Sequence, residues 1–253
     1  MKREIRIFFT ALMFFTRIPC PKWTDHSPEY LNKSSRYFPL VGAIVGSIGA
    51  LTFYIAALVF PIQVSILLSM ISTILATGAF HEDGLADVCD GFGGGWTKES
   101  ILRIMKDSRV GAFGVIGLIA VLSLKFICLN QIEVKLIPII LVASHSLSRF
   151  VASTLLFTLE YVRDDADSKA KPAAQKMSIP SLIIGGLFGI LPLFLFQNYL
   201  VFLILIPAFA MRWYLANYFK KWIGGQTGDC GGATQQICEV IIYLSFIGLW
   251  KYI

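Results

Sequence analysis

The segment HEDGLADVCDGFGGG, residues 81–95, holds the side chains best suited to chemistry, and it directly follows an apolar run. Four carboxylates and one histidine occupy its first ten positions. If the apolar helix of 62–80 continues through them, three aspartates recur at i, i+4 and i+7, within an arc of roughly 60°. They are Asp83, Asp87 and Asp90. Like charges near the carboxyl end of a helix repel one another and oppose the helix dipole, so an ordinary solvated face is a poor explanation.

The chemistry that these aspartates predict is the binding of a hard divalent cation. Mg²⁺ prefers oxygen ligands, keeps several of its waters and bridges carboxylates to substrate phosphates. We therefore predict that Asp83, Asp87 and Asp90 ligate Mg²⁺, and that this cofactor holds a diphosphate. The alternative is an acidic helix end that faces water.

The two ends of the segment carry further expectations. His81 is either an acid–base or supporting residue of the site, or a histidine packed at the membrane interface, and the sequence favours neither. Gly91 and the glycines at 93–95 should end the helix, because glycine commonly terminates helices.

The elements around this segment are those of a membrane protein. Of the 253 residues, 56% are hydrophobic and only 15% are charged, whereas a soluble domain is about a quarter charged. Crossing the hydrocarbon takes roughly 20 apolar residues of helix. The candidate spans are 38–60, 62–80, 112–129, 134–157, 181–197, 199–217 and 236–250. We therefore expect an all-α, polytopic transmembrane helical bundle of about seven spans in the lipid bilayer, with residues 1–253 forming a single domain.

The basic residues indicate the orientation of this bundle. Seven Lys or Arg precede residue 38, four lie in 81–111 and four in 158–180. Because basic loops stay in the cytoplasm, the N-terminus and the acidic segment should face the cytoplasm. This requires a hairpin at 197–198, since a single kinked helix over 181–217 would move everything after it to the other side. Basic charge confined to particular loops also argues against a nucleic-acid partner.

These residues carry a resemblance to one enzyme family. HEDGLADVCDG, at 81–91, resembles the motif of the adenosylcobinamide-GDP ribazoletransferases, the cobalamin synthases of bacteria and archaea. Other motifs occur in the family's order and at similar separations, namely FFTRIP (14–19), FPLVG (38–42), MKDSRVGAFG (105–114), SR (148–149) and GGQTGD (224–229). The resemblance covers nearly the whole chain, and no acidic position departs from it.

The resemblance implies a reaction at the cytoplasmic (inner) membrane. Members of the family join adenosylcobinamide-GDP to α-ribazole, or to α-ribazole 5′-phosphate, and release GMP, with a requirement for Mg²⁺. The product is adenosylcobalamin or its 5′-phosphate. On this chain we expect the ribose 3′-hydroxyl to attack the cobinamide-side phosphorus, with Asp83 and His81 as candidate proton acceptors. Phosphoryl transfer needs mainly positioning and electrostatic stabilisation, which the acidic segment would supply.

A short amphipathic helix over 97–111 should carry a basic stripe, since Arg103, Lys106 and Arg109 recur every third residue. Binding to anionic lipid explains such a stripe as well, and for Arg103 the two interpretations are evenly balanced. The family motif favours phosphate binding by Lys106 and Arg109, with Asp107 as an orienting residue or a further metal ligand.

Three more places complete the predicted phosphate site. Arg149 lies within a span, where a charge is costly and usually functional, although snorkelling or a structural pairing is the alternative. The glycine-rich GGQTGD, by itself a plain turn, would offer backbone N–H groups beside three polar side chains, those of Gln226, Thr227 and Asp229. Arg17 either binds phosphate or lies at the membrane surface.

Several features stay outside the predicted site. Lys125 should snorkel at the far end of its span, and His145 is not a position of the family motif. The five cysteines form no CxxC pair and indicate neither a disulfide framework nor a zinc site. The sequence is compatible with a monomer or a homo-oligomer.

Two other classes of protein compete with this interpretation. A cation transporter should place its charges at mid-bilayer on several helices, whereas here the acids cluster at one membrane face beside basic residues. A CDP-alcohol phosphotransferase or a prenyltransferase would share an acidic diphosphate site but act on a lipid.

Overall fold

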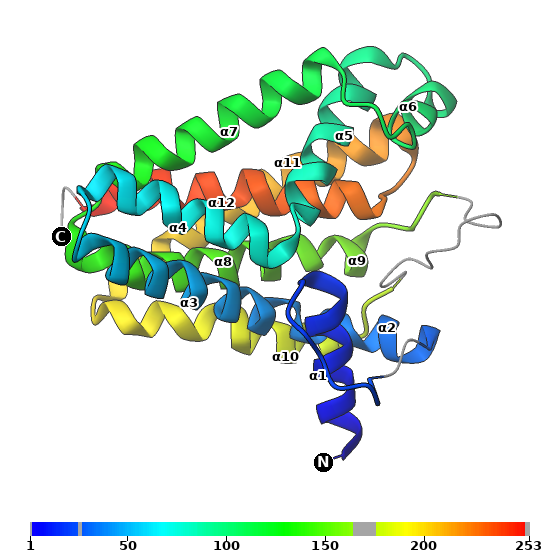
Figure 1. The fold of residues 1–253 in the computed structure, drawn as a ribbon. Coiled ribbons are helices and arrows are strands. Elements are labelled where there is room, and N and C mark those ends of the chain that lie inside the picture. Colours follow the sequence, from blue (N-terminus) through cyan, green and yellow to red (C-terminus); the bar gives the residue numbers. More distant parts are fainter. Residues whose placement is uncertain (1, 25–26, 164–175, 251–253) are drawn as a thin grey trace.

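The computed structural model describes residues 2–24, 27–163 and 176–250. Over these ranges the only β-type pairing is one isolated bridge, between Tyr161 and Gln226, and the regular elements are all helical. Figure 1 shows long, roughly parallel helices with shorter helices gathered at one end. The predicted all-α bundle is confirmed.

The longer helices form the body of the bundle, and the shorter ones connect them. In chain order they are α1 (Lys2–Phe15), α2 (Pro28–Ser34), α3 (Phe38–Ala57), α4 (Ile62–Thr77), α5 (Phe80–Gly94), α6 (Lys98–Ile104), α7 (Ala112–Asn130), α8 (Ile137–Ser153), α9 (Leu155–Thr158), α10 (Ile179–Ile190), α11 (Leu205–Ile223) and α12 (Gly228–Trp250). Short 3₁₀ helices extend some of these, namely η1 (Ser35–Tyr37), η2 (Val134–Leu136), η3 (Leu191–Phe196) and η4 (Tyr199–Ile204).

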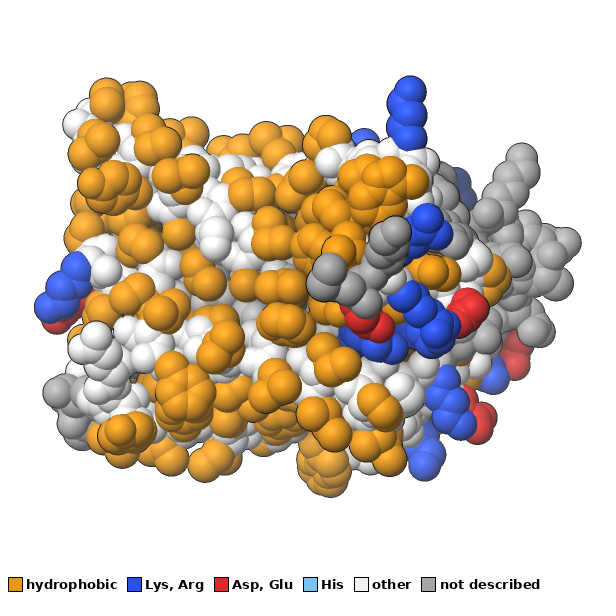
Figure 2. Space-filling view, turned by 90° about the horizontal axis from the view of Figure 1, so that it is seen from below, with side chains coloured by type: hydrophobic (Ala, Val, Ile, Leu, Met, Phe, Trp, Pro, Cys, Tyr) orange, Lys and Arg blue, Asp and Glu red, His pale blue; other side chains and the backbone are white. Residues whose placement is uncertain are grey.

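The length and hydropathy of these helices fit a multi-pass membrane protein. Six are long and apolar enough to cross a membrane, and a seventh span arises if α4 and α5 count as one bent pair. Figure 2 shows hydrophobic side chains over most of the visible face, while charged side chains gather mainly at one end. This is the end at which α1, α2, α5 and α6 lie in Figure 1, and we call it the charged end.

The predicted hairpin at 197–198 is confirmed. Ile179–Phe196 and Tyr199–Ile223 are separate spans, and Gln197 adopts a left-handed conformation with φ 54° between them. The Asn198 side chain then accepts a hydrogen bond from the Leu200 N–H at 3.0 Å. The turn returns the chain to the charged end, so that the GGQTGD segment lies at the same end as the acidic segment.

The predicted continuation of the apolar helix to Asp90 is wrong. The chain bends by 88° between α4 and α5, because Gly78 and Ala79 adopt left-handed φ values of 65° and 58°. Asp83 therefore lies in the first turn of a new helix, where the dipole stabilises a carboxylate instead of opposing it.

The glycines after the aspartates fulfil the prediction only in part. Helix α5 ends at Gly94, with Gly95 as its C-cap, as expected for the glycines at 93–95. It runs through Gly91, where a Cβ atom would clash with the Met105 side chain. Gly91 thus permits close packing of α6 against α5 and does not end the helix.

Candidate active site

The packing of α5 on α12 builds the acidic face of the site. Small residues allow it, since a Cβ on Gly84 would lie 3.1 Å from Asp229 Cα, and one on Gly232 would lie 3.3 Å from the His81 carbonyl. This contact brings Asp229 within electrostatic range of Asp83 and Asp87. Asp83 is exposed and Asp87 half-buried. We call Asp83, Asp87 and Asp229 the acidic cluster.

Asp90 faces a different neighbour. Its buried carboxylate accepts hydrogen bonds from the backbone N–H of Gly111 at 2.6 Å and of Gly114 at 2.8 Å, at the first turn of α7. Each oxygen of the Asp90 carboxylate thus accepts from a backbone N–H that has no partner within α7, as is usual at the start of a helix. Metal binding by Asp90 stays a prediction, while the contact observed is a cap on a membrane span.

Replacing Asp90 by Ala should destabilise the protein by about 1–3 kcal/mol, because the buried N–H of Gly114 and the part-buried N–H of Gly111 lose a charged acceptor. Thermal unfolding in detergent measures this change. The exposed Asp83→Ala is the matched control and should unfold like the wild type. Equal melting of Asp90→Ala and wild type would show that the α7 cap contributes little.

The basic segment after α6 is a loop and not the helical stripe that was predicted. Helix α6 begins with Thr97 as its N-cap, in a capping box with Ser100, but it ends at Ile104. Arg109 Nη2 donates to Asp107 Oδ2 at 2.6 Å, and these hydrogen bonds lower the pKa of the Asp107 carboxyl to about 2. Lys106 and Arg109 remain exposed at the charged end.

Other predicted phosphate-binding residues lie in contrasting environments. Arg17 is exposed, and its backbone N–H donates to the Ala76 carbonyl at 2.7 Å beside the α4–α5 bend. Gln226 and Thr227 are buried. Thr227 Oγ1 accepts from the Cys230 N–H at 3.4 Å, and so caps the start of α12 directly before Asp229.

Asp229 has a cationic partner that the sequence did not single out. Arg163 Nη2 lies 2.8 Å from Asp229 Oδ2 and 3.3 Å from the Met105 carbonyl, to which it also donates. A lone arginine beyond the end of a span forms no pattern with its neighbours, so only the fold reveals this contact.

The acidic cluster fits a metal ion shared with a substrate. No group of three or more His, Cys, Asp or Glu within the described ranges is arranged to hold a metal by itself. Mg²⁺ commonly takes only one or two protein carboxylates and completes its shell with water and substrate phosphates. The carboxylates of Asp83, Asp87 and Asp229 suit that mode of binding rather than a closed protein cage.

Comparison with known proteins shows the family to which this chain belongs. The sequence model described as cobalamin-5-phosphate synthase matches residues 7–247. The adenosylcobinamide-GDP ribazoletransferases of Shewanella oneidensis and Shewanella frigidimarina are each 48% identical to this chain, over 95% and 98% of its length and 93% and 96% of theirs. The chain belongs to the cobalamin-5-phosphate synthase family. No solved structure matches it.

In this member of the family, His81 and Arg149 face the protein interior. The His81 ring stacks on Phe38, with centroids 5.5 Å apart, and neither ring nitrogen has a hydrogen-bond partner among the described residues. Arg149 is 2% exposed and its Nη1 donates to the His145 carbonyl at 3.0 Å. Arg149 therefore does not snorkel. The stacking of His81 on Phe38 agrees with the alternative that this histidine is a packed residue. Its acid–base role stays a prediction.

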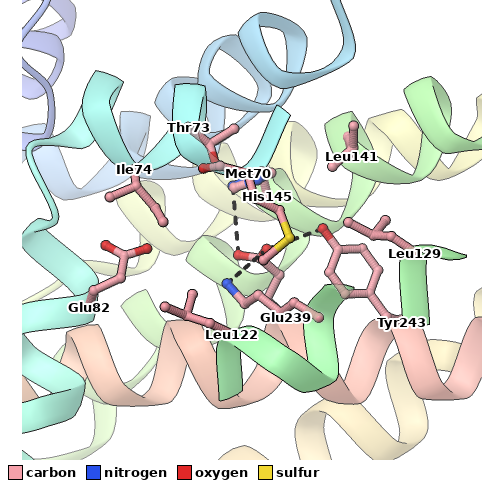
Figure 3. Close-up of a pocket in the computed structure, with 11 residues that line it drawn as sticks. Met70, Thr73, Ile74, Glu82, Leu122, Leu129, Leu141, His145, Glu239 and Tyr243 are labelled. Atoms are coloured by element: carbon pink, nitrogen blue, oxygen red, sulfur yellow. Dashed lines mark hydrogen bonds and ion pairs between the residues drawn. The ribbon is translucent and has the colours of Figure 1, made fainter. Parts of the chain in front are cut away.

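Lys125 does not snorkel either, which corrects the prediction for it. Its Nζ lies 3.0 Å from Glu239 Oε1, and both side chains are almost fully buried. Tyr243 Oη donates to Glu239 Oε1 at 3.1 Å, and His145 Nδ1 lies 3.7 Å from Glu239 Oε2. Figure 3 shows His145 of α8 close to Glu239 and Tyr243 of α12. We call Lys125, His145, Glu239 and Tyr243 the buried ion cluster.

The buried ion cluster is linked to α5 through Gln236, and the cavity between them is small. Gln236 donates from Nε2 to Glu82 on α5 at 2.9 Å and accepts from Lys125 Nζ at 2.7 Å. The cavity that Glu82 lines with the cluster measures about 10 Å³, which is room for roughly one water. Its charges are paired with one another, so this cluster gives the transporter alternative little support.

Proposed function

We propose that this protein joins adenosylcobinamide-GDP to α-ribazole, or to α-ribazole 5′-phosphate, and releases GMP, the late step of cobalamin biosynthesis for which its relatives are named. The observation that carries the proposal is the acidic cluster at the charged end, formed by α5 and α12, with Arg163 paired to Asp229. An acidic face beside a guanidinium is suited to a nucleoside diphosphate and its metal.

In the reaction, the 3′-hydroxyl oxygen of α-ribazole forms a bond to the cobinamide-side phosphorus, and the bond to the GMP phosphate breaks. Asp83, the exposed member of the acidic cluster, would accept the hydroxyl proton. Mg²⁺ held by the acidic cluster would neutralise the diphosphate and the departing GMP. Lys106 and Arg17, exposed at the same end, would add positive charge around the leaving phosphate.

We further propose that the active site faces the cytoplasm. The charged end carries the basic N-terminal helices and the loop after α6, while the other end has few charged side chains in Figure 2. Basic segments are retained on the cytoplasmic side during insertion. The nucleotide substrate and the released GMP would then exchange directly with the cytoplasm.

A measurement of GMP release tests the substrate class. Purified protein in lipid nanodiscs should release GMP from adenosylcobinamide-GDP only when both α-ribazole and Mg²⁺ are present. CDP-diacylglycerol with a lipid alcohol should yield no CMP, because neither nominal substrate of the proposed reaction is a lipid. Release of CMP without release of GMP would favour the CDP-alcohol phosphotransferase alternative.

A further inference from the structure

The chain fixes Arg163 against the glycine-rich segment through its backbone. The Gln226 N–H donates to the Glu160 carbonyl at 2.8 Å, and the Val162 N–H donates to the Gln226 carbonyl at 3.0 Å. A Cβ on Gly225 would clash with the Glu160 carbonyl, so the close approach requires glycine there. Arg163 therefore projects from a defined backbone position beside the start of α12.

The guanidinium of Arg163 joins two segments that the sequence predicts to bind phosphate. Its Nη2 contacts Asp229, from GGQTGD, and the Met105 carbonyl, from MKDSRVGAFG. Its Nε is buried and has no hydrogen-bond partner among the described residues. A buried donor without an acceptor costs about 1–3 kcal/mol, so such a group leaves a place for an acceptor, either a water or a ligand.

The donors of the guanidinium indicate what kind of acceptor fits. Three carboxylates form the acidic cluster, and within the described ranges Arg163 is the cation in an ion pair with it. Arg109 is already paired with Asp107. A guanidinium carries five N–H donors in a planar fork suited to phosphate oxygens, so one Asp229 contact leaves capacity for an anion.

We propose that Arg163 is a substrate-binding residue that acts in two ways. It pairs with Asp229 in the acidic cluster, and it donates its remaining N–H groups to the diphosphate of the nucleotide substrate. This assignment rests on the proposed function for the identity of the nucleotide. It also predicts that Arg163 weakens metal binding by the acidic cluster in the absence of nucleotide, because its charge repels a cation.

The test is Arg163→Gln, measured for nucleotide and for metal separately. The KM for adenosylcobinamide-GDP should rise about 10- to 100-fold, while the KM for α-ribazole changes little. Binding of Mn²⁺ alone, followed by electron paramagnetic resonance without nucleotide, should tighten several-fold. The two shifts have opposite signs, which loss of structure would not produce.

Two further variants keep the test decisive. Arg163→Lys retains the charge but loses the fork, so it should raise the nucleotide KM and leave Mn²⁺ affinity near the wild-type value. Lys220→Gln removes an exposed cation from α11 that has no assigned role in phosphate or metal binding, so it is the control and should change neither. If Arg163→Gln failed to fold, Arg163→Lys would still report on the nucleotide KM.

The outcomes separate this assignment from the proposed function. Unchanged nucleotide KM in both Arg163 variants, or weaker Mn²⁺ binding in Arg163→Gln, would overturn the assignment of Arg163. If the wild type released no GMP, the proposed function would fail instead. Binding of GDP by calorimetry would then still test Arg163, since the assignment predicts weaker GDP binding in Arg163→Gln.

Discussion

Replacing Asp87 by Asn should lower the rate of GMP release by about 10³-fold or more. The Asn amide has a similar shape but lacks the negative charge that would bind the metal and, through it, the diphosphate. Asp87 is the half-buried member of the acidic cluster and lies three residues after Gly84, which packs against Asp229 of α12. The measurement is the initial rate of GMP formation, with thermal unfolding as the test of folding.

The matched control for Asp87 is Glu99→Gln, which removes an exposed carboxylate from α6 at the same end of the bundle. It should retain the wild-type rate. An Asp87→Asn enzyme that turns over like the wild type would refute the assignment of Asp87 as a metal ligand.

Replacing Glu239 by Gln should destabilise the protein by about 3–5 kcal/mol, because Lys125 would remain buried as an uncompensated charge. The pair lies 3.0 Å apart between α7 and α12, and both side chains are shielded from water and lipid. Unfolding of the detergent-solubilised protein by heat or denaturant measures the loss.

The double variant Lys125→Met with Glu239→Gln is the control for this pair. Removing both charges should restore a large part of the stability, since no lone charge stays buried. If the double variant were as unstable as the single one, the shape of the side chains and not their charge would explain the effect.

Much of the fold could be predicted because the bilayer constrains sequence strongly. A spanning helix must be apolar over roughly 20 residues and must satisfy its own backbone. The predicted spans accordingly fall on α3, α4, α7, α8, α12 and the two arms of the hairpin around Gln197. The bend at Gly78 and Ala79 was missed because hydropathy does not register two left-handed residues.

For a similar reason, some features of the candidate site could be predicted from the sequence and others could not. The spacing of Asp83 and Asp87 on one helix is a local property, so it survives the change in where α5 begins. The capping of α7 by Asp90 and the pairing of Arg163 with Asp229 depend on contacts between distant segments. Such contacts leave no periodic trace in a single sequence.

The most direct measurement is an experimental structure of the protein with adenosylcobinamide-GDP and Mn²⁺, in which anomalous scattering locates the metal. The expected map has Mn²⁺ and the diphosphate over Asp83, Asp87 and Asp229, with Arg163 donating to a phosphate oxygen. A diphosphate bound elsewhere on the bundle, with no metal near α5, would contradict phosphoryl transfer at the acidic cluster.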